Sequence, residues 1–430
     1  MTKGAGLTAL YLLLLAAGSA GLWKVRARET FRAGGPEISV YAVEPASPSS
    51  RQLAKHEPES GCYLGAYVDL DPAVRSTYTD RTGKVRRLPA EFERSTGRVH
   101  ALYFFYLGYG RPAPSDWIEK LDGESRLVQI ALEPNEGLGR VQDDEYLRSL
   151  ADALGKTKAR IFLRFASEMN GPWTAYHGNP ALYVEKWRLV TRIMRERAPN
   201  VAMLWCPYTV PVNPIESYYP GDEYVDWVGV NLYSVLYYNQ NRLHPGEHDH
   251  PADMLTWIYR RYAERKPIMI CEYAAANFSA LGEVKCPEFA ASSIRALYAS
   301  LPARFPRVKC VTYFSSNNLL LKHRLNNDYS VLSNRQVLEA YRSAIADPYF
   351  ISTGASHSPV VPVPLEQRQR EYGKLRVYAR SDSPEGYVRV FAAGSEIFRS
   401  PAPGGEFEDP GTTVTAVLYS RSGRRLATFP

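Results

Sequence analysis

The chain has 430 residues, of which 45% are hydrophobic and 23% are charged, and these values exclude a disordered, collagen-like or coiled-coil protein for its bulk. This length predicts two or three average domains, or one large barrel with an accessory module. The net charge of +7 is dispersed, with no run of five lysine or arginine residues, so we expect no nucleic-acid partner.

The composition of the N-terminal segment predicts a signal peptide or a membrane anchor. Residues 5–23 are apolar or small throughout and follow Lys3. They predict either a secretory signal, cleaved after Gly18-Ser19-Ala20, or an uncleaved membrane anchor, and the flanking charges do not decide between the two. Both readings put the rest of the chain outside the cytoplasm, as a secreted, periplasmic or anchored protein that meets the membrane only through this segment.

Residues 24–59 contain several prolines and serines without a sustained apolar period, which predicts a tether. Over residues 60–350, short apolar runs then recur at regular intervals. Short apolar or β-branched runs occur at Gly61–Val68, Val99–Leu107, Leu127–Pro134, Arg160–Glu168, Val201–Tyr208, Val225–Tyr233, Pro267–Tyr273 and Val308–Ser315.

Amphipathic, helix-like stretches lie between most of these runs, as over 144–154 and 181–198. Continuously apolar strands separated by helices are typical of a buried parallel sheet, and eight such units predict a (β/α)8 barrel of the α/β class. A doubly wound open sheet is the alternative, but no glycine-rich phosphate loop follows the first strand. Residues 351–373 predict a proline-rich linker, and residues 374–430 predict a small antiparallel β module that leans on the barrel.

Cysteine and histidine patterns give little support to a metal site. The five cysteines are odd in number and lack C-x-x-C spacing, and most fall in apolar runs where a thiol acts as a small hydrophobe. A loop over 243–251 carries His244, His248, Asp249 and His250, which could bind a metal. We favour a solvated loop, and we expect no metal and no cofactor.

Two glutamates end predicted barrel strands. Glu168 ends the fourth strand and Glu272 ends the seventh, so both lie at the mouth where barrel active sites are built. Retaining glycoside hydrolysis needs such a pair, with a proton donor and a nucleophile about 5–5.5 Å apart. We therefore predict Glu168 and Glu272 as catalytic residues, and Asp69 and Glu133, which end the first and third strands, as candidate subsite residues.

Three neighbours are predicted to support this pair, although each has a structural alternative as a packing residue. Arg164 lies on the same strand face as Glu168 and could keep a nearby carboxylate ionised. Tyr233 ends the sixth strand and could hydrogen-bond Glu272. Trp173 follows Glu168 on the loop and could stack on a sugar ring.

Three motifs resemble glycoside hydrolase family 26, the family of β-mannanases and related endo-β-glycanases. They are RFASEMNGPW at 164–173, YPGDEYVDWVGVNLY at 219–233 and KPIMICE at 266–272, and the resemblance covers about residues 60–345. It implies that Glu168 is the acid/base and Glu272 the nucleophile, with Trp173 and Tyr233 in the sugar cleft. Asn170, within the first motif, is included among the supporting residues.

One residue departs from the family pattern. Mannanases of the family usually carry a histidine before the acid/base glutamate, and this chain has Ser167 there. We expect a monomeric retaining endo-β-glycanase acting on mannan-type or mixed-linkage β-glucan polysaccharide through a glycosyl-enzyme. Ser167 keeps open an alternative, a non-catalytic carbohydrate-binding or polysaccharide-assembly protein on the same barrel, and a metal-dependent hydrolase is a third reading.

Overall fold

A computed structural model describes residues 34–46, 51–321, 326–354, 357–368, 373–381 and 385–430. The predicted signal or anchor at residues 1–23 lies outside these residues. Within the described ranges, no helix is both long enough and apolar enough to cross a membrane.

The predicted (β/α)8 barrel is confirmed. Its eight parallel strands pair in chain order, and the last closes on the first through the register Cys310↔Tyr63 to Phe314↔Tyr67. The strands are β2 (Cys62–Tyr67), β5 (Leu102–Gly108), β6 (Leu127–Glu133), β7 (Ile161–Phe165), β8 (Val201–Trp205), β9 (Trp227–Ser234), β10 (Ile268–Ala275) and β13 (Val308–Phe314).

Helices surround the barrel because each carries an apolar stripe that packs on the strands. They are α2 (Pro89–Thr96), α3 (Ser115–Gly123), α4 (Glu145–Thr157), α5 (Pro180–Arg197), α6 (Pro251–Tyr262), α7 (Pro287–Arg304) and α8 (Arg335–Ile345). The connection from β8 to β9 is made by 3-10 turns at Ile215–Tyr218 and Asp222–Tyr224. Short strands decorate the loops: β3 (Thr77–Thr79), β4 (Val85–Arg87), β11 (Phe278–Ser279), β12 (Val284–Lys285), β14 (Asn327–Asp328) and β15 (Phe350–Ile351).

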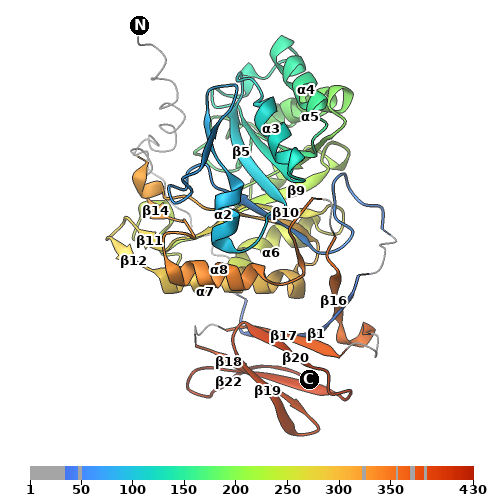
Figure 1. The fold of residues 1–430 in the computed structure, drawn as a ribbon, viewed down its shortest axis with the longest axis vertical. Helices are drawn as coiled ribbons and strands as arrows, with labels where there is room; N and C mark the ends of the chain where they lie inside the picture. The colour runs from blue at the N-terminus through green and yellow to red at the C-terminus, as the bar shows by residue number, and fades with distance from the viewer. Residues whose placement is uncertain (1–33, 47–50, 322–325, 355–356, 369–372, 382–384) are drawn as a thin grey trace.

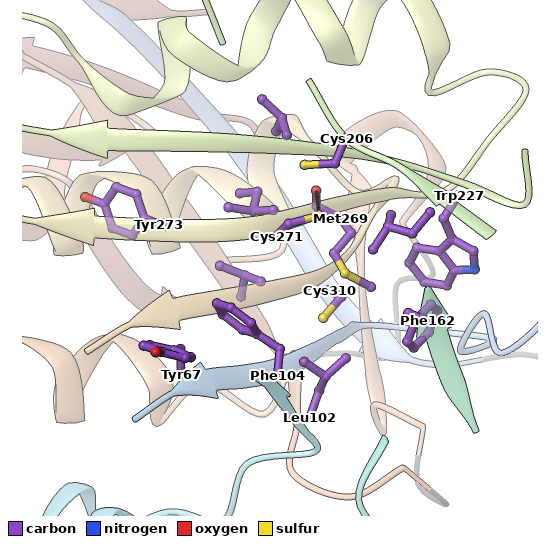
Figure 2. Packing of buried hydrophobic residues seen from close by; sticks show 14 of the residues in the cluster. Tyr67, Leu102, Phe104, Phe162, Cys206, Trp227, Met269, Cys271, Tyr273 and Cys310 are labelled. Carbon is purple, nitrogen blue, oxygen red and sulfur yellow. Dashed lines mark hydrogen bonds between the residues drawn. The ribbon is translucent and has the colours of Figure 1, made fainter. Parts of the chain in front are cut away.

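The barrel interior is filled by large and sulfur-bearing side chains. Figure 2 shows Phe104 from β5, Met269 and Cys271 from β10, Cys310 from β13 and Cys206, directly after β8, gathered in this core. All five cysteines are buried and free, which fits their predicted behaviour as small hydrophobes.

The C-terminal module consists of two small antiparallel sheets that share their own core (Figure 1). One sheet has the order β16-β1-β17-β20 and the other β19-β18-β21-β22. The strands are β1 (Glu37–Pro45), β16 (Val360–Pro364), β17 (Lys374–Arg380), β18 (Tyr387–Ala392), β19 (Ser395–Pro401), β20 (Gly404–Glu408), β21 (Val414–Tyr419) and β22 (Arg425–Phe429).

The prediction of a tether over 24–59 is wrong for residues 37–45. These residues form β1, which lies between β16 and β17 in the C-terminal module. Ile38, Val40 and Ala42 alternate with Ser39 and Tyr41 and belong to the module core. This alternating stretch is short and lies between prolines, so the sequence did not indicate a strand. The chain thus contributes a strand to this module before it builds the barrel.

Part of the predicted linker over 351–373 is also a strand. Residues 360–364 form β16, which pairs with β1 at the edge of its sheet. An edge strand tolerates proline because its outward N–H groups need no partner, so the proline-rich sequence did not indicate a strand. The remaining predicted domain boundaries stay predictions.

A buried ion pair joins the module to the barrel. Both guanidinium Nη atoms of Arg380, on β17, donate to the carboxylate of Asp253, at the start of α6, at 2.6 Å each. Both side chains are nearly inaccessible to solvent. Arg376 of the same strand pairs with Asp347 at 2.5 Å. Because Arg380 and Asp253 are buried at this contact, their ion pair holds the module against the helices of the barrel.

Arg380→Ala is expected to destabilise the protein by about 3–5 kcal/mol, because it leaves the buried Asp253 carboxylate without its counter-charge. Arg389→Ala is the matched control in the same module: Arg389 pairs with Glu396 at a more exposed position, and its loss is expected to leave the stability nearly unchanged. Thermal unfolding of the three proteins measures this difference. Equal midpoints for both variants would contradict the expected role of the Arg380 contact.

Candidate active site

The nucleophile candidate, Glu272, is aimed by a bulge in its strand. In the pairing of β10 with β9, Ile270 lies opposite Val230 and Glu272 opposite Asn231, so Cys271 is an extra residue. A bulge of this kind changes the direction in which a side chain points. The bulge gives Glu272 a place directly beside Asn231 at the barrel mouth.

Glu272 is buried and fully engaged by its neighbours. Its Oε1 accepts a hydrogen bond from Arg164 Nη2 at 2.5 Å and another from the Tyr106 hydroxyl at 2.6 Å. Its Oε2 accepts from the Tyr233 hydroxyl. The Arg164 ion pair lies in the barrel interior, where Arg164 is wholly buried. One carboxylate is thus held rigidly, with a counter-charge and two hydroxyl donors.

The acid/base candidate, Glu168, is placed by a turn at the end of β7. Ala166 and Glu168 both adopt left-handed backbone conformations, with φ of 47° and 60°. Such angles are unfavourable for residues with a Cβ and persist where surrounding contacts enforce them, often at active sites. The Glu168 N–H donates to the Cys206 carbonyl at 2.8 Å, which ties this turn to the neighbouring strand end.

Glu168 is partly exposed and has neutral hydrogen-bond donors instead of a paired cation. Its Oε1 accepts from Asn231 Nδ2 at 2.7 Å and its Oε2 from the Trp173 indole N–H at 2.6 Å. Desolvation, followed by repulsion from Glu272, raises the pKa of Glu168 to about 7, against the opposing effect of the two donors and of Arg164. This carboxyl can therefore hold a proton near neutral pH.

Asn231 connects the two carboxylates, and sequence reasoning gave it no role. Its Oδ1 accepts from Arg164 Nη1 at 3.1 Å and from the Cys206 thiol at 3.3 Å, so its amide nitrogen is left facing Glu168. A continuous network therefore runs from Glu168 through Asn231 and Arg164 to Glu272. The available signal was its position two residues before Tyr233, on the same face of the strand.

Trp173 is folded back onto Glu168, and Gly171 makes this possible. A Cβ on Gly171 would lie 2.2 Å from the indole ring of Trp173, so a side chain there would displace the ring. The ring also meets Tyr208 edge-on, with centroids 5.3 Å apart. The predicted sugar-stacking residue thus also donates a hydrogen bond to the acid/base candidate, a contact that the sequence did not predict.

Asn170 supports a neighbouring loop. Its side chain is buried, donates to the carbonyls of Tyr208 and Pro211 at 2.8 and 2.9 Å, and accepts from the Tyr208 N–H at 2.9 Å. These bonds hold the segment after β8 against the turn that carries Glu168. Its role is support of the backbone at the barrel mouth.

The two subsite candidates have different surroundings. Asp69 pairs with Arg86 at 3.0 Å, and Arg86 also pairs with Asp80, so Asp69 belongs to a buried structural ion-pair cluster. Glu133 lies next to the turn that carries Glu168, where its Oε1 accepts from the Ser167 hydroxyl at 2.5 Å. Sequence reasoning recognised the position of Glu133 but did not predict its contact with Ser167.

The histidine loop does not form a metal-binding group. His250 begins α6, and its Nδ1 accepts from the Ala252 N–H at 3.2 Å, while His248 is almost fully exposed. Burial lowers the pKa of His250 to about 3. Among the residues that the structure describes, no cluster of three or more histidine, cysteine or acidic side chains could hold a metal ion.

Comparison with known proteins gives partial matches. Residues 133–245 match the model of glycosyl hydrolase family 26. A β-1,3-xylanase from Alcaligenes sp is 29% identical over 142 residues, which are 28% of this chain and 29% of that protein. Endoglucanase H from Acetivibrio thermocellus is 26% identical over 331 residues, covering 71% of this chain and 34% of that protein. The chain thus spans about a third or less of these curated relatives.

Among solved structures, a modular endo-β-1,4-mannanase from Cellulomonas fimi aligns with a TM-score of 0.49 at 14% identity, covering 88% of this chain and 99% of that chain. The family match covers the strand ends that carry Glu133, Glu168 and Tyr233, and it ends before Glu272. The predicted resemblance is confirmed: residues 133–245 of the barrel match the glycosyl hydrolase family 26 model.

Proposed function

We propose that this chain is a retaining endo-β-glycanase in which Glu272 attacks the anomeric carbon and Glu168 protonates the leaving oxygen. The observation that carries the proposal is the unequal environment of two carboxyl groups at one barrel mouth. Glu272 is paired with Arg164, as suits a group that must act as an anion. Glu168 has a pKa of about 7, as suits a group that gives up and regains a proton.

The mechanism follows from these roles. Attack by Glu272 forms a glycosyl-enzyme while Glu168 donates its proton to the departing oxygen. Glu168, now ionised, then accepts a proton from water as that water attacks the anomeric carbon. Tyr106, Tyr233 and Arg164 hold the Glu272 carboxylate in place throughout, so little reorganisation is needed at the moment of attack.

The proposed substrate is a β-linked polysaccharide. The relatives named above act, by their names, on β-1,3-xylan, on glucan and on β-1,4-mannan, and these backbones define the range to test. We favour mannan-type or mixed-linkage β-glucan. The experiment is a screen of the purified chain against mannan, mixed-linkage β-glucan and β-1,3-xylan, read as new reducing ends. Binding without new reducing ends on any of the three would favour a carbohydrate-binding protein instead.

The pH dependence of the reaction is expected to report Glu168. Because Glu168 must be protonated to donate, kcat/KM on a substrate with a poor leaving group should fall as the pH rises through about 7. Trp173→Phe removes a donor that favours the ionised form, so the pKa of Glu168 should rise and the alkaline limb should move to higher pH. Trp257→Phe, on α6, is the control and should leave the limb unchanged. A limb that does not move in Trp173→Phe would contradict this assignment.

We also propose that the protein acts outside the cytoplasm, either secreted, periplasmic or anchored by residues 1–23. Cell fractionation with N-terminal sequencing separates the cases. A mature N-terminus near Gly21 indicates cleavage, and detergent-dependent release of the full chain indicates an anchor. Full-length protein in the cytoplasmic fraction would overturn the proposal.

A further inference from the structure

A third carboxyl group lies beside the catalytic turn, in a buried cluster of three side chains. Glu133 ends β6, and its Oε1 accepts from the Ser167 hydroxyl at 2.5 Å. The Tyr176 hydroxyl oxygen lies within hydrogen-bond distance of Glu133 Oε2 and also 2.7 Å from the Ser167 carbonyl oxygen. Glu133, Ser167 and Tyr176 are each less than a tenth exposed, so the cluster is shielded from solvent.

The protons available to this cluster determine the charge of Glu133. Tyr176 has a single hydroxyl proton but two close oxygen neighbours, the Glu133 carboxyl and the Ser167 carbonyl. A carboxylate and a carbonyl can only accept hydrogen bonds. If Glu133 is ionised, the single Tyr176 proton must therefore serve both oxygens, and one of the two contacts lacks a proton of its own. A protonated Glu133 resolves the conflict: its Oε2–H donates to Tyr176, and Tyr176 donates to the Ser167 carbonyl.

The surroundings of Glu133 favour the neutral form. Burial raises the pKa of Glu133 above its usual range. Arg164, on β7, and the hydrogen bonds from Ser167 and Tyr176 oppose this rise, while the negative charge of Glu272, on β10, adds to it. The direction agrees with the proton count of the cluster.

The cluster holds Ser167, the residue between two left-handed backbone positions. Ser167 lies between Ala166 and Glu168, whose φ angles of 47° and 60° are left-handed. The Ser167 hydroxyl is held by Glu133 and the Ser167 carbonyl by Tyr176, so the cluster fixes two of its three polar groups. Rotation of this peptide would redirect the Glu168 carboxyl that follows it. The contacts of the cluster thus restrain the residue directly before Glu168.

We propose that Glu133 is a neutral carboxylic acid and that, with Tyr176, it is a positioning residue for Glu168 instead of a third catalytic carboxylate. Its effect on catalysis rests on the proposed function of Glu168. Its protonation state does not, and the two can be tested separately.

Infrared difference spectroscopy tests the protonation state without any need for activity. The spectrum of the wild-type chain minus that of Glu133→Gln, both at pH 6, should contain the carbonyl stretch of a protonated carboxyl group, and this band should shift in D2O. Glu168 is present in both proteins and cancels. A difference spectrum with only carboxylate bands would overturn the neutral assignment.

Leaving-group dependence tests the positioning role. Glu133→Gln keeps a donor and an acceptor and should retain near wild-type kcat/KM. Glu133→Ala and Tyr176→Phe should lose about 10²-fold on aryl glycosides with poor leaving groups, since a misplaced acid donates poorly, yet little on dinitrophenyl glycosides, which need no proton. Tyr78→Phe, which removes a tyrosine–carboxylate bond to Asp116 away from the site, is the matched control.

Two results would overturn the positioning role: equal loss in Glu133→Gln and Glu133→Ala, or equal loss on both substrate classes. If the wild-type chain hydrolyses no glycoside, the positioning role falls with the proposed function, while the infrared result still decides the charge of Glu133.

Discussion

Glu272→Ala should abolish hydrolysis of every substrate, including glycosides with excellent leaving groups. The nucleophile forms the bond that replaces the glycosidic bond, so a better leaving group cannot compensate for its loss. Nucleophile removal in comparable catalytic units costs about 10⁴–10⁶-fold in rate. Measurement of kcat/KM on dinitrophenyl glycosides isolates this step, because these substrates need no proton from Glu168.

The alanine variant also leaves Arg164 buried without its carboxylate, so a folding defect must be separated from a chemical one. Glu272→Gln keeps the size of the side chain and one acceptor oxygen for either Tyr106 or Tyr233, and it should be equally inactive. Glu288→Ala, an exposed glutamate in the first turn of α7, is the control for a carboxylate lost elsewhere on the barrel. A folded Glu272→Gln protein with substantial activity on dinitrophenyl glycosides would refute the nucleophile assignment.

Added azide offers a second readout of the same variant. In Glu272→Ala, azide can enter the space of the missing carboxylate and attack from the same side. The product would be a glycosyl azide of anomeric configuration opposite to that of the substrate, because only one displacement takes place. A product of unchanged configuration would show that the nucleophile lies elsewhere.

The meeting of Glu168 and Glu272 at one barrel mouth could be predicted from sequence because the signal was local. Glu168 and Glu272 each end an apolar run, and in a parallel barrel all such ends meet at one mouth. The confirmed barrel follows from the same rhythm of apolar runs and amphipathic stretches. Neither inference required knowledge of which side chains touch.

The contacts that tune the pair were not predictable because they depend on distant residues. Asn231 and Tyr106 come from strands β9 and β5, and their local sequences do not say which carboxyl group each one contacts, Glu168 for Asn231 and Glu272 for Tyr106. The bulge at Cys271, which brings Glu272 opposite Asn231, appears only in the pairing of two strands. β1 was missed for a similar reason, since its partners lie more than 300 residues away along the chain.

Glu168→Ala is expected to slow the hydrolysis of substrates whose leaving group needs a proton much more than that of substrates whose leaving group needs none. Glycosides with poor leaving groups should lose about 10²–10⁴-fold in kcat/KM, the usual contribution of general acid catalysis. Dinitrophenyl glycosides should still react with Glu272, and the glycosyl-enzyme should then accumulate because water has lost its base. Rapid-quench mass spectrometry should detect a sugar attached to the peptide that contains Glu272.

Azide should relieve this block, in contrast to its effect on Glu272→Ala. Azide needs no deprotonation, so it can attack the accumulated glycosyl-enzyme from the face that Glu168 normally serves. Two displacements then give a glycosyl azide with the configuration of the substrate. The pH dependence should change as well: the alkaline limb near pH 7 should disappear in Glu168→Ala, because the group with that pKa is gone. A limb that persists, or equal losses on both substrate classes, would mean that another residue donates the proton, and Glu133 would then be the next candidate at this barrel mouth.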